Sequence, residues 1–183
     1  NKDDNDGPSQ TQNQARILKF TPGSTPGTYD LAGDIAEGAD ITAVVGIAVD
    51  AAGNVYAADN YNGHLPPPGY RKQIRKRTPS GDWNVEDLAV NSSVIENPTD
   101  IAVDSEGNVF VIDYPTMGRY STLIYKLQAN GDTWEEITPS SSGPLPFNAF
   151  GITVDPFDNV LVSSFIDGTV SKLKPGVDSA EAS

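Results

Sequence analysis

The chain has 183 residues, no cysteine and a formal net charge of −13, and hydrophobic residues make up 37% of it. This length fits one domain with its own core, the missing cysteines exclude disulfides and thiolate metal sites, and the acidic charge argues against nucleic-acid binding, which needs a basic surface. No apolar run approaches the roughly 20 residues that span a bilayer, and the 17 glycines and 14 prolines favour short strands and turns over long helices.

The first segment, residues 1–14, is polar and lacks a starting methionine. Its composition predicts a flexible segment. We expect that a signal peptide preceded it and was removed, which would place the protein outside the cell, in a periplasm or at a cell surface. Residues 15–175 are expected to hold the folded part, and residues 176–183 a flexible tail.

One pattern recurs three times along the folded part. It reads "GIAVDAAGNVYAAD" at 46–59, "DIAVDSEGNVFVID" at 100–113 and "GITVDPFDNVLVSS" at 151–164, with its isoleucines 54 and then 51 residues apart. Each copy has two β-branched runs around a tight turn, which predicts a β-hairpin of strands A and B.

Two further runs complete the repeat. A third run, strand C, follows each hairpin as "QIRKR" at 73–77, "LIYKL" at 123–127 and "TVSKL" at 169–173. A fourth run, strand D, begins at Trp83 and at Trp134. The same C and D patterns occur near the start of the chain, as "RILKF" at 16–20 and "TYDLA" at 28–32. The order C–D, A–B–C–D twice, then A–B–C gives at most thirteen strands.

Antiparallel four-stranded units that need a neighbour on each face are blades of a β-propeller, so we predict an all-β fold with about three blades. The phrases "GIAVDAAGNVYAADN" and "PTDIAVDSEGNVFVID" resemble the repeats of NHL-type propellers and their relatives, the gluconolactonase and streptogramin lyase types. The resemblance implies that the A–B and C–D turns lie at one end of the blades and the B–C and D–A loops at the other. It leaves both enzymes and binding platforms open.

The predicted B–C and D–A loops are long and carry aromatic and arginine residues, the composition of a contact surface. We predict that a protein or small-molecule partner binds there, the alternative being that the aromatics cap the blade ends. The candidate residues are Tyr61, His64, Tyr70, Arg71, Tyr114, Arg119, Tyr120 and Phe147. The only histidine is His64, which we expect to be a surface residue rather than a general acid or base.

Recurring carboxylates raise the question of a metal ion. Asp50, Asp104 and Asp155 each end strand A, and Ca²⁺ is the ion that such oxygen ligands would bind. One aspartate per blade is too far from the next to share an ion, so we expect each to accept hydrogen bonds within its own turn. The resemblance to gluconolactonase implies a central divalent ion, for which Asp100 is the weak candidate. We therefore expect no cofactor.

The run "RKQIRKR" at 71–77 holds five of the twelve basic residues in this acidic chain. The favoured interpretation is an outer strand whose long basic stems cover apolar neighbours. The other is a docking patch for an acidic partner.

The leading hypothesis for function is a non-catalytic extracellular binding or assembly module, because no catalytic constellation is recognisable. The alternatives are a metal-dependent lactonase or hydrolase, an enzyme of streptogramin lyase type, and the subunit of an extracellular filament. Three blades cannot form a ring without exposing two apolar faces and one strand edge. Strand exchange between copies would cover them, as would further blades if these residues belong to a longer protein.

Overall fold

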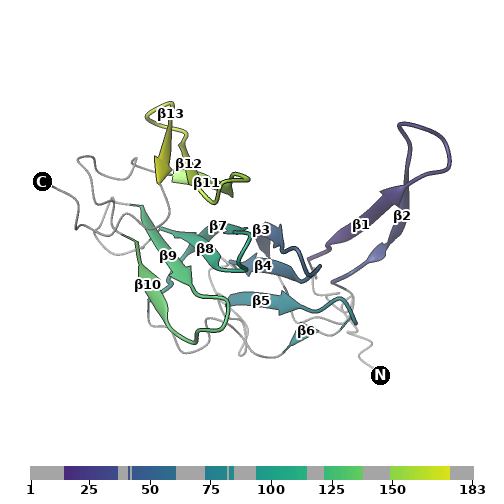
Figure 1. Ribbon diagram of the computed structural model, residues 1–183, viewed down its shortest axis with the longest axis horizontal. Helices are drawn as coiled ribbons and strands as arrows, with labels where there is room; N and C mark the ends of the chain where they lie inside the picture. Colours follow the sequence, from purple (N-terminus) through teal and green to yellow (C-terminus); the bar gives the residue numbers. More distant parts are fainter. Residues whose placement is uncertain are drawn as a thin grey trace, which may run out of the picture. The chain divides into compact units, whose positions relative to one another are not determined.

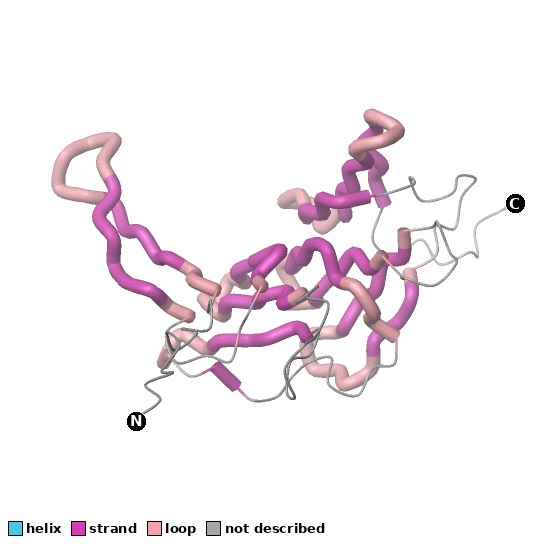
Figure 2. The backbone as a smooth tube through the Cα atoms, turned by 180° about the vertical axis from the view of Figure 1, so that it is seen from behind, coloured by secondary structure: helices cyan, strands magenta, loops and turns pink. Residues whose placement is uncertain are grey.

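The computed structural model describes residues 15–36, 41, 43–60, 73–81, 83–84, 94–114, 122–137 and 149–173 (Figure 1). Every regular element in these ranges is a β-strand, and turns join the strands without an intervening helix in the described part (Figure 2). No described helix is long and apolar enough to cross a membrane. The predicted all-β class is confirmed.

Three antiparallel sheets follow one another along residues 43–173, and the strands within each sheet pair in chain order. The first sheet contains β3 (Val44–Val49), β4 (Val55–Asp59), β5 (Gln73–Arg77) and β6 (Trp83–Asn84). The middle sheet contains β7 (Pro98–Val103), β8 (Val109–Asp113), β9 (Leu123–Leu127) and β10 (Trp134–Glu136). The third contains β11 (Ala149–Val154), β12 (Val160–Ser164) and β13 (Thr169–Leu173). These sheets are the propeller blades predicted from the repeat.

The turns between the first two strands of the sheets require a left-handed backbone. Gly53 and Gly107 adopt φ angles of 83° and 85°, which glycine reaches without a Cβ clash. In the third sheet the same repeat position holds Asp158, with φ of 59°. This is the one described non-glycine residue with positive φ, and what holds it there is described below.

The first strand of each sheet begins earlier than predicted because it contains a β-bulge. The register shifts between Val44 and Gly46, between Pro98 and Asp100, and between Ala149 and Gly151. One extra residue is therefore inserted at the same place in all three repeats, which bends the strand and re-aims its side chains.

The core lies between the sheets, and β7 contacts both β3 and β11. One apolar cluster joins the first and middle sheets, and includes Tyr56, Ile74, Val111 and Tyr125. A second joins the middle and third sheets, and includes Phe110, Ile112, Ile152 and Val162. The middle sheet is buried on both faces for this reason, and every residue of β8 is buried.

The chain divides into two units, residues 1–42 and residues 43–183. In the first unit, β1 (Leu18–Pro22) and β2 (Tyr29–Asp34) form the predicted C–D hairpin, with a bulge between Lys19 and Phe20. The carboxylate of Asp34 accepts hydrogen bonds from Arg16 Nε at 2.8 Å and from the backbone N–H groups of Ile17 and Ala36. Because the Arg16 guanidinium donates to it, the pKa of Asp34 is lowered.

Candidate functional site

The predicted loop surface is described at one residue only. Tyr114 follows β8, is half-buried, and donates its backbone N–H to Asn97 O at 3.0 Å. The other candidates lie outside the described residues, namely Tyr61, His64, Tyr70, Arg71, Arg119, Tyr120 and Phe147. The structure does describe the bases from which these loops leave the sheets.

Two buried aspartates hold the loop bases of the first and middle sheets. Asp59, at the end of β4, is 1% exposed and accepts the backbone N–H of Ala43 at 2.6 Å. Asp113, at the end of β8, is 0% exposed and accepts the backbone N–H groups of Glu96 and Asn97. Each carboxylate therefore ties the segment entering the first strand to the end of the second strand, at the end of the sheet where the B–C loop begins.

The loop bases of neighbouring sheets are also joined to each other. Asn60 Nδ2 donates to Pro98 O at 2.8 Å, which links the first sheet to the middle one. The buried hydroxyl of Thr122 accepts the backbone N–H of Ala149 at 2.9 Å, which links the middle sheet to the third. Buried polar bonds of this kind are costly to break, so they hold the positions of three successive loop bases relative to one another.

Both carboxylate oxygens of Asp100 accept backbone N–H groups. Its Oδ1 accepts the N–H of Ile101 and its Oδ2 accepts the N–H of Ile152, both at 2.9 Å. The second bond joins β7 to β11 across two sheets. The equivalent residues in the other repeats are Gly46 and Gly151, and a Cβ added at Gly46 would lie 2.5 Å from Asp100 Oδ1. The carboxylate thus fills space that the flanking glycines leave open.

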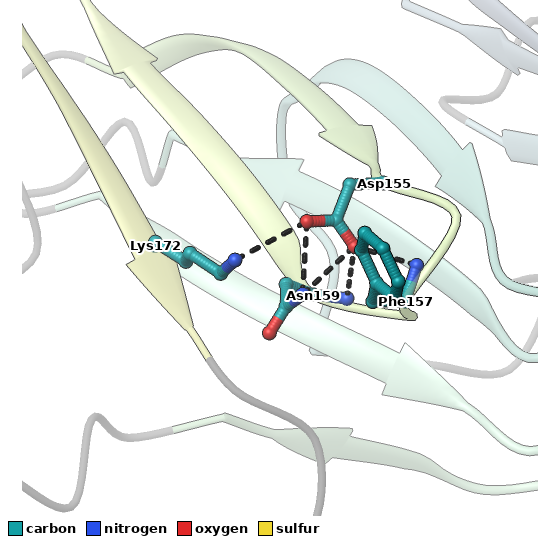
Figure 3. Close-up of polar contacts among 4 residues, drawn as sticks. All are labelled: Asp155, Phe157, Asn159 and Lys172. Carbon is teal, nitrogen blue, oxygen red and sulfur yellow. Dashed lines mark hydrogen bonds and ion pairs between the residues drawn. The ribbon is translucent and has the colours of Figure 1, made fainter.

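The repeated Asp-turn-Asn pattern forms a local hydrogen-bond unit, as expected from the sequence. Asp155 accepts the backbone and side-chain N–H groups of Asn159 and the backbone N–H of Phe157 (Figure 3). Lys172 Nζ lies 3.3 Å from the same carboxylate. Desolvation alone would raise the pKa of Asp155. The hydrogen bonds from Asn159, Phe157 and Lys172 outweigh this effect and lower the pKa to about 2.

The same unit recurs in the other two sheets. Asp50 accepts the backbone N–H and Nδ2 of Asn54, and Asp104 accepts those of Asn108. The hydroxyl of Tyr56 also donates to Asp50 at 3.1 Å. Desolvation raises the pKa of Asp50, but the hydrogen bonds from Asn54 and Tyr56 outweigh it and hold this pKa below its usual value. Burial and the nearby Asp50 charge raise the pKa of Tyr56.

A further tie joins the turns of the middle and third sheets. The carboxylate of Asp158 accepts the backbone N–H of Ser105 at 2.9 Å and its hydroxyl at 2.7 Å. These bonds lower the pKa of Asp158. They also explain why an aspartate occupies a left-handed position that glycine takes in the other repeats, since the side chain reaches the neighbouring sheet from there.

Two lysines at one repeat position lie over aromatic rings. Lys76 Nζ is 5.2 Å from the centroid of Tyr56, and Lys126 Nζ is 5.6 Å from that of Phe110. In the basic run, Arg75 lies opposite Ala57, whose side chain is fully buried. This agrees with the interpretation that basic stems cover apolar neighbours.

The described residues hold no group of three or more histidines and carboxylates placed to bind a metal ion. They do contain a shallow depression of about 320 Å³ beside the turns of the middle sheet, lined by Glu106, Asn108, Gln128, Ala129, Asn130 and Gly131. It lies at the end opposite the loop bases.

Sequence reasoning did not find the loop anchors Asp59 and Asp113. A signal was present, because both end the second strand of their repeat, where the third repeat has Ser164. Their burial depends on the segment that enters the first strand, and a single sequence does not reveal that contact.

Comparison with solved structures gives propellers. A structural-genomics crystal structure assigned as a gluconolactonase has 20% sequence identity with this chain and a TM-score of 0.47. The match covers 70% of this chain and 43% of the gluconolactonase chain. Virginiamycin B lyase from Staphylococcus aureus has 17% identity and a TM-score of 0.48, and covers 92% and 51%. A gluconolactonase from Xanthomonas campestris has 15% identity and a TM-score of 0.45, and covers 71% and 46%.

This chain therefore spans about half the length of the solved structures that it matches. No family model matches it, and no curated protein matches it. The solved structures that the chain matches are of the gluconolactonase and lyase types that its repeats resemble, and the NHL repeat in particular is not confirmed.

Proposed function

We propose that the chain is a non-catalytic, extracellular binding module whose B–C and D–A loops recognise a protein or small-molecule partner. The observation that carries this proposal is the set of buried anchors beneath the loops. Asp59 and Asp113 are 1% and 0% exposed, and the carboxylates of both accept hydrogen bonds from backbone N–H groups of the loop bases.

Anchoring of this kind suits recognition for a physical reason. A loop binds tightly only when little conformational freedom is lost on contact, and fixed bases reduce that loss. The ties from Asn60 to Pro98 and from Ala149 to Thr122 extend the same order from one sheet to the next. The aromatic and arginine residues predicted for the loops would then be presented on a rigid frame.

The proposal is tested by removing two loop aromatics together, Tyr61→Ala and Tyr120→Ala, and measuring capture of extracellular molecules from the producing organism by the immobilised full-length chain. We expect capture to be lost while the melting temperature stays the same. The matched control is Phe157→Ala, because Phe157 is 80% exposed in a turn at the opposite end of its sheet. Undiminished capture by the double variant would contradict the proposal.

A second candidate is an enzyme of the metal-dependent lactonase or lyase class. The observation that favours it is a pair of buried oxygen atoms near the loop bases, Asn60 Oδ1 and Thr99 Oγ1, which have no hydrogen-bond partner within the described residues. Thr99 is also the bulged residue of β7, and bulges often re-aim side chains beside active sites.

The donor set nevertheless does not fit a divalent ion within the described residues. Ca²⁺ takes six to eight oxygen ligands, several of them carboxylates, and the nearest carboxylate on this strand, Asp100, already accepts two backbone N–H groups. We therefore derive no catalytic step through a metal. Hydrolysis of a sugar lactone that requires Ca²⁺ and is lost in both Asn60→Ala and Thr99→Val would place the enzyme candidate above the binding module.

A further inference from the structure

The two apolar clusters of the core follow one packing rule. Each sheet has a leading face, turned toward the preceding sheet, and a trailing face, turned toward the next. In the middle sheet the leading face comprises Ile101, Val109, Val111, Tyr125 and Leu127, and the trailing face comprises Ala102, Phe110, Ile112 and Ile124.

The rule holds at both contacts between sheets. The trailing face of the first sheet, with Tyr56, Ala58 and Ile74, packs on the leading face of the middle sheet. The trailing face of the middle sheet packs in the same way on Ile152, Val160 and Val162, the leading face of the third. Equivalent repeat positions therefore make equivalent contacts, because the strand registers of the sheets are the same.

The outermost faces keep part of this apolar pattern, and several of their apolar side chains are exposed. Arg75 and Arg77 take the positions of Tyr125 and Leu127 on the leading face of the first sheet, where Ala57 is buried. Ser163 takes the position of Ile112 on the trailing face of the third sheet.

On the leading face of the first sheet, Ile47 is 53% exposed and Val49 is 60% exposed. Ile101 and Ile152 occupy the position of Ile47 in the other sheets, and they are only 3% and 7% exposed. The difference lies in the neighbour, since the residue, the strand and the register are unchanged.

The trailing face of the third sheet is exposed in the same manner. Val170 of β13 is 69% exposed, whereas Ile74 and Ile124 at the same repeat position are fully buried. Phe165 and Ile166, in the turn that precedes β13, are 86% and 64% exposed. Exposed apolar side chains on a sheet face and in the adjoining turn are typical of an interaction surface.

We propose that the leading face of the first sheet docks on the trailing face of the third sheet of a second copy of this chain. Such a contact would continue the interfaces inside the chain, where a leading face twice packs on a trailing face. One copy presents both halves of that interface, one at each end of its row of sheets. The contact is head-to-tail, and it involves sheet faces rather than exchanged strands. It is independent of the loop surface proposed above.

The test uses two variants of the full chain, each with a charge on one outer face. Ile47→Asp damages the leading face, and Val170→Asp damages the trailing face. Both side chains are more than half exposed, so we expect each variant to keep the strand signal of the wild type in circular dichroism. The melting temperatures should agree at low concentration, where the wild type is also monomeric. Phe157→Asp is the control, since this exposed aromatic lies in a turn outside both faces.

Sedimentation velocity over a wide range of concentration is the measurement. We expect the wild type and Phe157→Asp to associate, and each face variant alone to stay at 19.4 kDa. An equal mixture of the two face variants should form a species of twice that mass, because each supplies the face that the other lacks. Association of only one face variant by itself would indicate like-with-like pairing and overturn the proposal.

Two other outcomes also overturn it. A wild-type chain that is monomeric at every concentration would mean that the outer faces are covered by further blades or by a different protein. Face variants that stay monomeric when mixed would mean that the leading and trailing faces do not recognise each other.

Discussion

The hydrogen bond from Ile152 to Asp100 joins two sheets, and its contribution to the free energy of unfolding can be predicted. Asp100→Gly introduces the residue that the first and third repeats have at the same position, Gly46 and Gly151. A comparison of repeats alone would predict a harmless change. The structure predicts a loss of stability, because the carboxylate is the acceptor for Ile152 N, which is otherwise buried between β7 and β11.

The magnitude follows from what the substitution removes. A hydrogen bond to a charged group contributes roughly 1.5–3 kcal/mol to stability, and glycine in a strand costs about 0.5–1 kcal/mol more in backbone entropy. We expect Asp100→Gly to lower the free energy of unfolding by roughly 2–4 kcal/mol. Asp100→Asn keeps the shape and one acceptor oxygen, so its effect should be smaller.

A double-mutant cycle with Gly46→Ala tests the packing part of the argument. The new Cβ would lie 2.5 Å from Asp100 Oδ1 and 2.9 Å from Asp100 Cα. Crowding of this kind costs about 1–3 kcal/mol. In the Asp100→Gly background the carboxylate oxygen is absent and only the contact with the Cα atom of residue 100 remains. Gly46→Ala should therefore destabilise this background less than the wild type. We expect a coupling energy of at least about 0.5 kcal/mol between the two sites.

Urea denaturation followed by the fluorescence of Trp83 and Trp134 measures these changes, provided that the denaturant slope is the same for all variants. A free energy of unfolding for Asp100→Gly within about 0.5 kcal/mol of the wild type, the range of an ordinary surface substitution, would contradict this role of Asp100. Equal destabilisation by Asn and Gly at this position would also contradict it.

Three further predictions concern the ties between and within the sheets. Asp158→Asn should lower the melting temperature because one of the two acceptors for Ser105 is lost, and Ser105→Ala should then add less than it does alone. In the folded protein the pKa of Asp155 is lowered to about 2 from the usual 3.8. Its stabilising contribution is therefore present above pH 3.8 and is lost as the pH falls toward 2. Melting temperatures measured across that pH range should depend less on pH in Asp155→Asn than in the wild type. Lys126→Met keeps the stem but removes the charge over the ring, and unfolding in urea should show a loss of about 0.5–1 kcal/mol that Lys19→Met, at the same repeat position of the hairpin, does not.

The sequence predicted the third strand of each repeat to the residue. β5, β9 and β13 have the predicted bounds, and β4, β8 and β12 lie in the second run of each predicted hairpin. The first strands begin two residues earlier than the predicted runs at Gly46 and Asp100. The extra residue of the bulge interrupts the period of two on which strand prediction depends, so the start of these strands was not visible.

The candidate site was predicted less well, since its features depend on contacts between repeats. The turn role of Asp155 follows from neighbours four residues away, and the sequence predicted it correctly. The role of Asp100 depends on Ile152, which lies 52 residues further along the chain. The series Gly46, Asp100, Gly151 held a signal, because one large residue between two small ones suggests close packing across strands, but only a structure shows which atoms meet.

The exposure of Ile47 leads to a conclusion about repeat proteins of this kind. Ile47, Ile101 and Ile152 share residue type, strand and register, yet they are 53%, 3% and 7% exposed. Local sequence therefore determines the strand and the face on which a side chain lies, while burial is determined by the next sheet. Since burial of apolar area supplies most of the stabilisation, each sheet is stabilised mainly by its neighbours. Among the described residues of 43–173, the middle sheet has two such neighbours, whereas the first and third sheets have one each.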